Sequence, residues 1–85
     1  MSKKTVVVGS QVGLHARPAS VIAEAAGEYD DEILLSVAGE EPVDASSVML
    51  IMTLGAEKGT SVTVESDNDE AVEKIAALIE SDLDA

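Results

Sequence analysis

Runs of apolar residues alternate with polar turns along the chain, and their spacing divides it into strands and helices. The segment 5–8 is β-branched throughout, and apolar residues occupy every second position in 33–37 and 60–65, so these three segments are predicted to be strands. Residues 42–43 fit only a short edge strand, because proline lacks the amide hydrogen that a ladder donor needs.

Helical spacing marks other parts of the chain. Apolar residues recur every three or four positions in 19–26, and Gly27 is a suitable C-terminal stop. The apolar run 48–54 is interpreted as a short helix, with a buried strand as the alternative. Asp67 and Glu70 have capping-box spacing ahead of a last helix. The apolar stripe of that helix is Val72, Ile75, Ala76, Ile79 and Leu83.

The order of these elements, β-α-β-β-α-β-α, predicts the fold class. Short loops and amphipathic helices favour an α+β fold in which one antiparallel sheet carries the helices on one face. The sequence contains no repeat, linker or low-complexity segment, so residues 1–85 are expected to form a single small domain. A chain of this length buries only about 60–65% of its unfolded surface, which limits the core.

Composition narrows the setting and the partners. The absence of cysteine excludes disulfides, thiol catalysis and thiolate metal sites, and favours a reducing cytoplasm. No signal-like run or apolar stretch near the roughly 20 residues of a membrane span occurs, so a cytoplasmic protein that is not membrane-embedded is expected. The net charge of −12 argues against nucleic-acid binding. All 17 acidic residues lie in 24–85, whereas 1–23 holds three cations and no acid.

The most informative chemistry lies in that acid-free segment. His15 and Arg17 are the only histidine and the only arginine, and Pro18, a residue favoured in the first helical turn, follows them. An imidazole with an unperturbed pKa near 6.5 is largely neutral at pH 7. The helix N-terminus and the arginine both favour an attached anion over a second positive charge. The segment therefore predicts a phosphoryl-accepting histidine, with a surface or capping histidine as the ordinary alternative.

Other chemistries find less support. A metal site at His15 lacks a second histidine or any cysteine, and Asp67-Asn68-Asp69 lacks the other ligands of a calcium loop. No Gly-x-Ser-x-Gly occurs, so a serine hydrolase is excluded. Ser46 and Ser47 are interpreted as helix caps or as regulatory phosphorylation sites. The run of Val48, Met49 and Met52 fits either core packing or an adaptable apolar surface.

The octapeptide Gly13-Leu14-His15-Ala16-Arg17-Pro18-Ala19-Ser20 resembles the active-site signature of the HPr family. These are histidine-containing phosphocarrier proteins of the bacterial phosphoenolpyruvate-dependent sugar phosphotransferase system. Ser47-Val48-Met49 and Met52-Thr53-Leu54-Gly55 resemble the second helix of that family, and the resemblance covers essentially the whole chain. It implies an open-faced β-sandwich of four antiparallel strands with three helices on one face.

The resemblance also implies a relay function without cofactor or metal. His15 takes a phosphoryl group from enzyme I through Nδ1, and passes it to the IIA domains of sugar permeases. Arg17 assists the transfer, and the phosphoryl group is cradled by Ala16, Arg17 and Pro18. The implied protein is a monomeric carrier that needs partner enzymes and is not itself an enzyme. Its partners are implied to bind at Ala16, Ser20, Val48, Met49 and Met52.

Serine regulation is a further implication. In some family members a kinase phosphorylates the serine at the position of Ser47, and a phosphatase reverses it. Because the turn 39–44 is one residue longer than the commonest family form, Ser46 stays as the alternative position. Two other functions remain open beside sugar transport. One is a serine-regulated binding module in which His15 is secondary, and the other is a histidine relay that serves nitrogen regulation.

Overall fold

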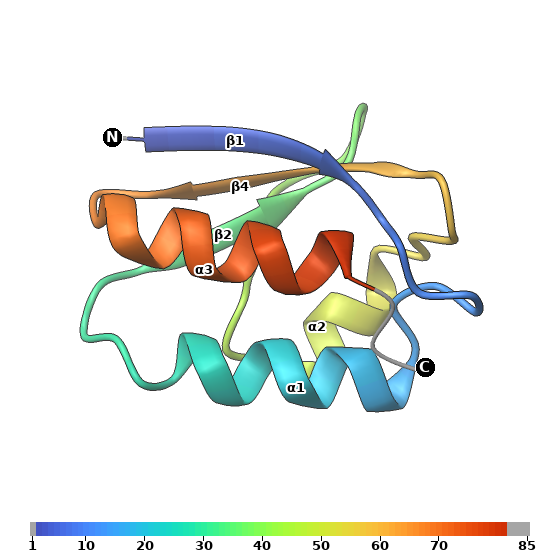
Figure 1. Ribbon diagram of the computed structural model, residues 1–85, viewed down its shortest axis with the longest axis horizontal. Coiled ribbons are helices and arrows are strands. Elements are labelled where there is room, and N and C mark those ends of the chain that lie inside the picture. The colour runs from blue at the N-terminus through green and yellow to red at the C-terminus, as the bar shows by residue number, and fades with distance from the viewer. Residues whose placement is uncertain (1, 82–85) are drawn as a thin grey trace.

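The computed structural model describes residues 2–81, and the predicted order of elements is confirmed (Figure 1). The run 48–54 contains a helix, as the preferred interpretation had it, and not a buried strand. The elements are β1 (Ser2–Val7), α1 (Ala16–Ala26), β2 (Ile33–Ser36), β3 (Val43–Asp44), α2 (Val48–Thr53), β4 (Ser61–Ser66) and α3 (Asp69–Glu80).

The four strands form one antiparallel sheet in the order β1-β4-β2-β3. The short strand β3 lies at one edge, as the proline before it predicted, and β4 occupies the interior between β1 and β2. All three helices cover the same face of the sheet (Figure 1). The expected α+β open-faced sandwich is therefore confirmed.

The core lies between the sheet and the helices. Strand residues at alternate positions, such as Leu35, Val62 and Val64, are fully buried, because side chains of a strand point alternately to its two faces. The helices contribute isoleucines to the same cluster, including Ile22 of α1 and Ile75 of α3. Burying each such side chain stabilises the fold by about 1.5–3 kcal/mol relative to leaving it exposed.

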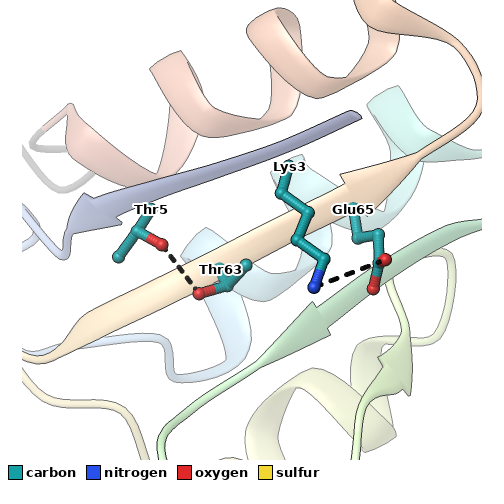
Figure 2. A network of polar contacts seen from close by, with 4 residues as sticks. All are labelled: Lys3, Thr5, Thr63 and Glu65. Carbon is teal, nitrogen blue, oxygen red and sulfur yellow. Dashed lines mark hydrogen bonds and ion pairs between the residues drawn. The ribbon is translucent and has the colours of Figure 1, made fainter. Parts of the chain in front are cut away.

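The opposite face of the sheet is polar. On this face Thr5 Oγ1 and Thr63 Oγ1 lie 2.8 Å apart, and Lys3 Nζ lies 3.9 Å from Glu65 Oε2 (Figure 2). Both pairs are direct cross-strand neighbours of β1 and β4. Such exposed pairs contribute little stability individually, at about 0–1 kcal/mol for an ion pair. Among the described residues, the three helices on the other face cover the core.

The start of α3 differs from the prediction by one residue. The N-cap is Asn68, whose Oδ1 accepts a hydrogen bond from Ala71 N at 3.1 Å, so Asp67 does not cap the helix. The reason is nonlocal, since pairing with Ser2 and Ile33 extends β4 to Ser66, whose Oγ then accepts from Asn68 N at 3.2 Å. The predicted stripe is buried at its first four positions, and Leu83 lies outside the described residues.

None of the helices formed by residues 2–81 has the length and apolar character needed to cross a bilayer.

Candidate functional site

His15 occupies the N-cap position of α1, as its place before the apolar helical repeat predicted. Its backbone is extended, with φ −85° and ψ −166°, and its carbonyl accepts the first helical hydrogen bond from Ala19 N at 2.9 Å. The imidazole makes no capping hydrogen bond to the helix, and the residue is exposed. Pro18 lies in the first turn and is buried, so the helix start is anchored directly behind the exposed ring.

The first turn of α1 offers two amide groups beside the imidazole. The N–H groups of Ala16 and Arg17 precede the first intrahelical hydrogen bond, and within residues 2–81 neither has an acceptor. Pro18 has no N–H to offer. Together with the positive end of the helix dipole, these two donors can bind oxygens of an anion attached to the ring. Of the predicted cradle, Ala16 and Arg17 contribute donors, whereas Pro18 contributes a fixed backbone angle.

The loop before the helix is held against a distant segment. Gly13 has φ +78°, and its N–H donates to Ser10 O at 3.1 Å. The next residue, Leu14, is buried and donates its N–H to Ala56 O at 2.9 Å. A Cβ atom on Gly13 would lie 2.5 Å from Ala56 O, closer than real Cβ contacts come. A glycine is therefore required both by the turn and by the close approach of the two backbones.

This contact creates a hollow beside His15. Its volume is about 240 Å³, and it is lined by Val12, Leu14, His15, Met52, Gly55, Ala56 and Glu57. Two of these residues, Val12 and Glu57, were not anticipated from the sequence. Val12, which is 64% exposed, is an apolar residue of this lining, and Glu57 is its acidic residue. No local pattern indicates either residue, because residues 12–15 and 56–57 meet only through the tertiary fold.

Helix α2 resolves the choice between core packing and an exposed apolar surface. Only Ile51 of this helix is buried, whereas Met49 is 76% exposed and Met52 is 44% exposed. Val48 is half-buried and lines an apolar hollow with Met49, Met52 and Thr53. Because Met52 also lines the hollow of His15, the apolar surface of α2 continues to the imidazole.

Helix α1 packs against α2 and presents two small residues of the predicted partner-binding set. Ala16 and Ser20 are both exposed, and Ser20 Oγ donates to Ala16 O at 2.8 Å. The hydroxyl is thereby engaged with the backbone of its own helix. We refer to the residues predicted to bind partners, Ala16, Ser20, Val48, Met49 and Met52, as the docking surface.

The charged residues near His15 in the fold are not the same as those near it in the sequence. Lys3 pairs with Glu65 on the open face of the sheet (Figure 2), and Lys4 Nζ lies 3.0 Å from Glu73 Oε1 of α3. Arg17 is thus the cation of segment 1–23 that lies at the site. The acid-free segment does not produce acid-free surroundings, because Glu57 lines the same hollow as His15.

The two serines have different environments. Ser47 is the N-cap of α2, and its Oγ accepts from Leu50 N at 3.2 Å, which confirms the capping interpretation for this residue. Ser46 is exposed and donates through Oγ to Asp44 Oδ1 at 2.7 Å and through its backbone N–H at 2.9 Å. The hydrogen bond from the hydroxyl and, to a smaller extent, that from the backbone lower the pKa of Asp44. The Asp44 carboxylate is therefore ionised at neutral pH directly beside Ser46.

Within residues 2–81 no three or more histidine or carboxylate side chains gather in an arrangement that could hold a metal ion.

Comparisons with known proteins place the chain in a family. The family model described as the PTS HPr component phosphorylation site matches residues 2–81. The phosphocarrier protein HPr of Mycoplasma capricolum is 33% identical over 84 residues, covering 99% of this chain and 93% of that protein. The phosphocarrier protein NPr of Klebsiella oxytoca is 35% identical over 77 residues, covering 91% and 86%.

Solved structures agree with the sequence comparisons. A crystal structure of HPr from Bacillus anthracis superimposes with a TM-score of 0.85 at 32% identity, covering 92% of this chain and 95% of that one. A crystal structure of HPr from Thermoanaerobacter tengcongensis gives a TM-score of 0.88, also at 32% identity, covering 100% and 98%. The chain therefore belongs to the HPr family of phosphocarrier proteins of the phosphotransferase system.

Proposed function

We propose that this protein carries a phosphoryl group on His15 from phosphorylated enzyme I to the IIA domains of sugar permeases. The observation that carries the proposal is the position of His15. It is an exposed imidazole at the N-cap of α1, beside two amide donors and Arg17 and next to an apolar surface. The chain acts as a single-domain, monomeric carrier in the cytoplasm, where enzyme I and phosphoenolpyruvate are found.

The transfer is a direct exchange between ring nitrogens. The lone pair of Nδ1 of neutral His15 attacks phosphorus in line, while the P–N bond of the phosphorylated donor breaks and the donor imidazole keeps that electron pair. No proton has to move, because each phosphorylated ring is an imidazolium whose charge disappears when the phosphoryl group leaves. In the next transfer phosphorylated His15 is the donor: an acceptor nitrogen attacks phosphorus, the P–N bond to His15 breaks, and the His15 imidazole keeps the electron pair.

Groups of this chain stabilise the phosphorylated form without enclosing it. The N–H groups of Ala16 and Arg17 and the dipole of α1 favour the attached dianion, the dipole by about 0.3–1 kcal/mol at an exposed site. The Arg17 guanidinium binds phosphate oxygens in charge-assisted hydrogen bonds. Phosphoryl transfer depends mainly on positioning and charge stabilisation, which the partners supply on the open side. This division of labour fits a carrier and not an enzyme.

The docking surface explains how one histidine serves several partners. Donor and acceptor must each approach His15 from its exposed side, so both bind the same surface in turn. The unbranched side chains of Met49 and Met52 adapt to differently shaped partners. Their exposure of 76% and 44% gives each partner an apolar contact beside the reacting nitrogen.

The first test measures intact mass after incubation with phosphoenolpyruvate and enzyme I. We expect one acid-labile phosphoryl group on the wild-type protein and none on His15→Ala. Arg17→Ala should accept the group more slowly, by about tenfold or more, if a charge-assisted hydrogen bond of about 1.5–3 kcal/mol acts in the transition state. Arg17→Lys retains the charge but not the bidentate geometry, so its rate of phosphoryl acceptance should lie between those of the wild type and Arg17→Ala.

Circular dichroism of each variant provides the control, because substitutions at these exposed positions should leave the fold intact. Full phosphoryl transfer through His15→Ala would refute the proposal. Absence of any phosphoryl group on the wild-type protein, with a competent enzyme I, would favour a serine-regulated binding module. Offering the phosphorylated protein to IIA domains of the sugar and of the nitrogen branch separates the two relay functions.

We propose further that Ser47, and not Ser46, accepts a regulatory phosphoryl group from a serine kinase and loses it to a phosphatase. A phosphate on Ser47 would lie at the N-cap of α2, where backbone N–H groups and the helix dipole favour an anion. A phosphate on Ser46 would replace the hydroxyl that donates to Asp44 and would place two anions together. Because Ser47 directly precedes Val48 and Met49, its phosphate would add charge at the edge of the docking surface.

A further inference from the structure

Among the described residues, one acidic residue, Glu57, lines the hollow beside His15. Glu57 is exposed and lines this hollow together with the imidazole. His15 and Glu57 line the same hollow of about 240 Å³, so they belong to one small part of the surface, and the Debye length at physiological ionic strength is about 8 Å. A charge on Glu57 therefore acts on a phosphoryl group attached to His15 before salt screens it completely.

No ion pair within the described part of the chain neutralises Glu57. Among residues 2–81 it has no cationic partner, since the ion pairs formed there join Lys3 to Glu65 and Lys4 to Glu73. Its neighbour Lys58 lines an adjoining hollow together with Gln11, Val12 and Glu57, and does not line that of His15. Glu57 forms hydrogen bonds with Thr60 through its backbone N–H and C=O groups. These hydrogen bonds do not involve its carboxylate.

We propose that Glu57 sets the phosphoryl-transfer potential of His15 by repelling the attached phosphoryl group. A phosphoryl group carries about two negative charges at pH 7. The start of α1 and Arg17 stabilise that charge, and a carrier that held it too strongly would not pass it on. The carboxylate opposes them and raises the free energy of the phosphorylated form. Onward transfer, in which the P–N bond to His15 breaks and the imidazole keeps the electron pair, becomes more favourable.

This inference rests on the proposed function and adds a thermodynamic role for a residue outside the signature. Glu57 forms no bond to the phosphoryl group during the transfer. It acts on the reaction through its charge alone and is not a catalytic residue. Removing its charge should stabilise phosphorylated His15, and replacing it with another anion should not. The effect should shrink as salt screens the interaction.

The test is a direct competition for phosphoryl groups. ¹⁵N-labelled wild-type protein and Glu57→Gln are mixed in equal amounts with catalytic enzyme I and less phosphoenolpyruvate than total protein. Intact mass then gives the phosphorylated fraction of each. At low salt we expect Glu57→Gln to hold about threefold more phosphoryl groups than the wild type, and the ratio to approach one at molar potassium chloride. Glu57→Asp should give a ratio near one at either salt concentration.

The matched control is Glu41→Gln, the same chemical change in the turn between β2 and β3. That turn lies on the far side of the sheet from α1 (Figure 1). A ratio near one for Glu57→Gln at low salt, or an equal effect of Glu41→Gln, would overturn the proposal. These outcomes differ from failure of the proposed function, in which neither competitor becomes phosphorylated.

A second measurement does not depend on enzyme I. Phosphoramidate phosphorylates histidine chemically, and the hydrolysis of the product at neutral pH can be followed by mass. Phosphorylated Glu57→Gln should lose its group more slowly than the wild type, by about the same factor as in the competition. Equal hydrolysis rates for the two proteins would count against repulsion by Glu57, whichever enzyme serves as donor.

Discussion

Gly13 shows how strongly a single residue near the site is constrained. It combines a left-handed backbone, φ +78°, with a neighbour that leaves no room for a side chain, because Ala56 O would lie 2.5 Å from a Cβ atom. The contact that imposes this limit is the backbone hydrogen bond from Leu14 to Ala56. The same hydrogen bond positions the residue before His15, so stability and the placement of the imidazole depend on one glycine.

We expect Gly13→Ala to lower the free energy of unfolding by about 2 kcal/mol or more. About 1–2 kcal/mol comes from the left-handed conformation, and the remainder from the contact with Ala56 O. Phosphoryl acceptance from enzyme I should also slow, because the loop must shift next to His15. Urea unfolding and the initial rate of phosphorylation measure the two effects.

Gly39→Ala is the matched control for this prediction. Gly39 has a similar backbone, φ +83°, but no atom lies within 4 Å of a Cβ built there. Gly39→Ala should therefore lose stability only through the left-handed conformation, without a steric contribution, and its rate of phosphorylation should be normal. Equal losses of stability in the two variants would show that the approach of Ala56 to Gly13 is unimportant.

At the scale of elements, α2 has little stability of its own. Six residues are too few for an isolated helix in water, so this one depends on its cap and on the burial of Ile51. The cap is Ser47, whose Oγ accepts from Leu50 N. The residue proposed for regulation is thus also the residue whose side chain caps the N-terminus of this helix.

Ser47→Asp should separate the effect of charge on the fold from its effect on docking. Aspartate is as good an N-cap as serine, so the free energy of unfolding should change by less than about 0.5 kcal/mol. Binding to enzyme I should weaken, because a negative charge then borders Val48 and Met49. Urea unfolding and calorimetric titration with enzyme I give the two readouts.

Ser46→Asp serves as the comparison, since it places the same charge one residue away. It removes the hydroxyl donor to Asp44 and sets two carboxylates side by side, so it should destabilise the fold more than Ser47→Asp. A larger loss of stability for Ser47→Asp than for Ser46→Asp would contradict the assignment of Ser47 as the site suited to phosphorylation.

For the whole molecule, the dominant electrostatic feature is a net charge of −12 on 85 residues. Repulsion among like charges destabilises a compact chain, and added salt screens it. Ion pairs offset little of this, because the pairs formed within residues 2–81 join two lysines to Glu65 and Glu73 at the surface. The fold should therefore be more stable in concentrated salt.

We expect the midpoint of thermal unfolding to rise by several degrees between about 10 mM and 1 M potassium chloride, where the Debye length falls from about 30 Å to 3 Å. The double variant Glu40→Lys/Glu41→Lys, which reduces the net negative charge in one exposed turn, should show a smaller rise. Calorimetry of both proteins at each salt concentration measures the difference. A midpoint independent of salt would show that the acidic surface does not oppose folding.

The sequence by itself determined the local features of this protein. The order of strands and helices, the short edge strand, and the position of His15 ahead of α1 all follow from side-chain spacing and capping preferences within a few residues. These preferences act through neighbouring backbone groups, so they can be recognised before the fold is known. The histidine, the arginine and the proline of the site belong to this class, which is why the resemblance to the HPr family was visible in one short segment.

Only the tertiary structure decided which side chains share the space around His15. Val12 and Glu57 line one hollow with His15 because Leu14 binds Ala56, and Lys3 is held away because its strand pairs with β4. The exposed face of α2 and the shift of the α3 cap to Asn68 also depend on packing between distant segments. Such contacts join segments that are distant in the sequence, so neither periodicity nor local charge could indicate them.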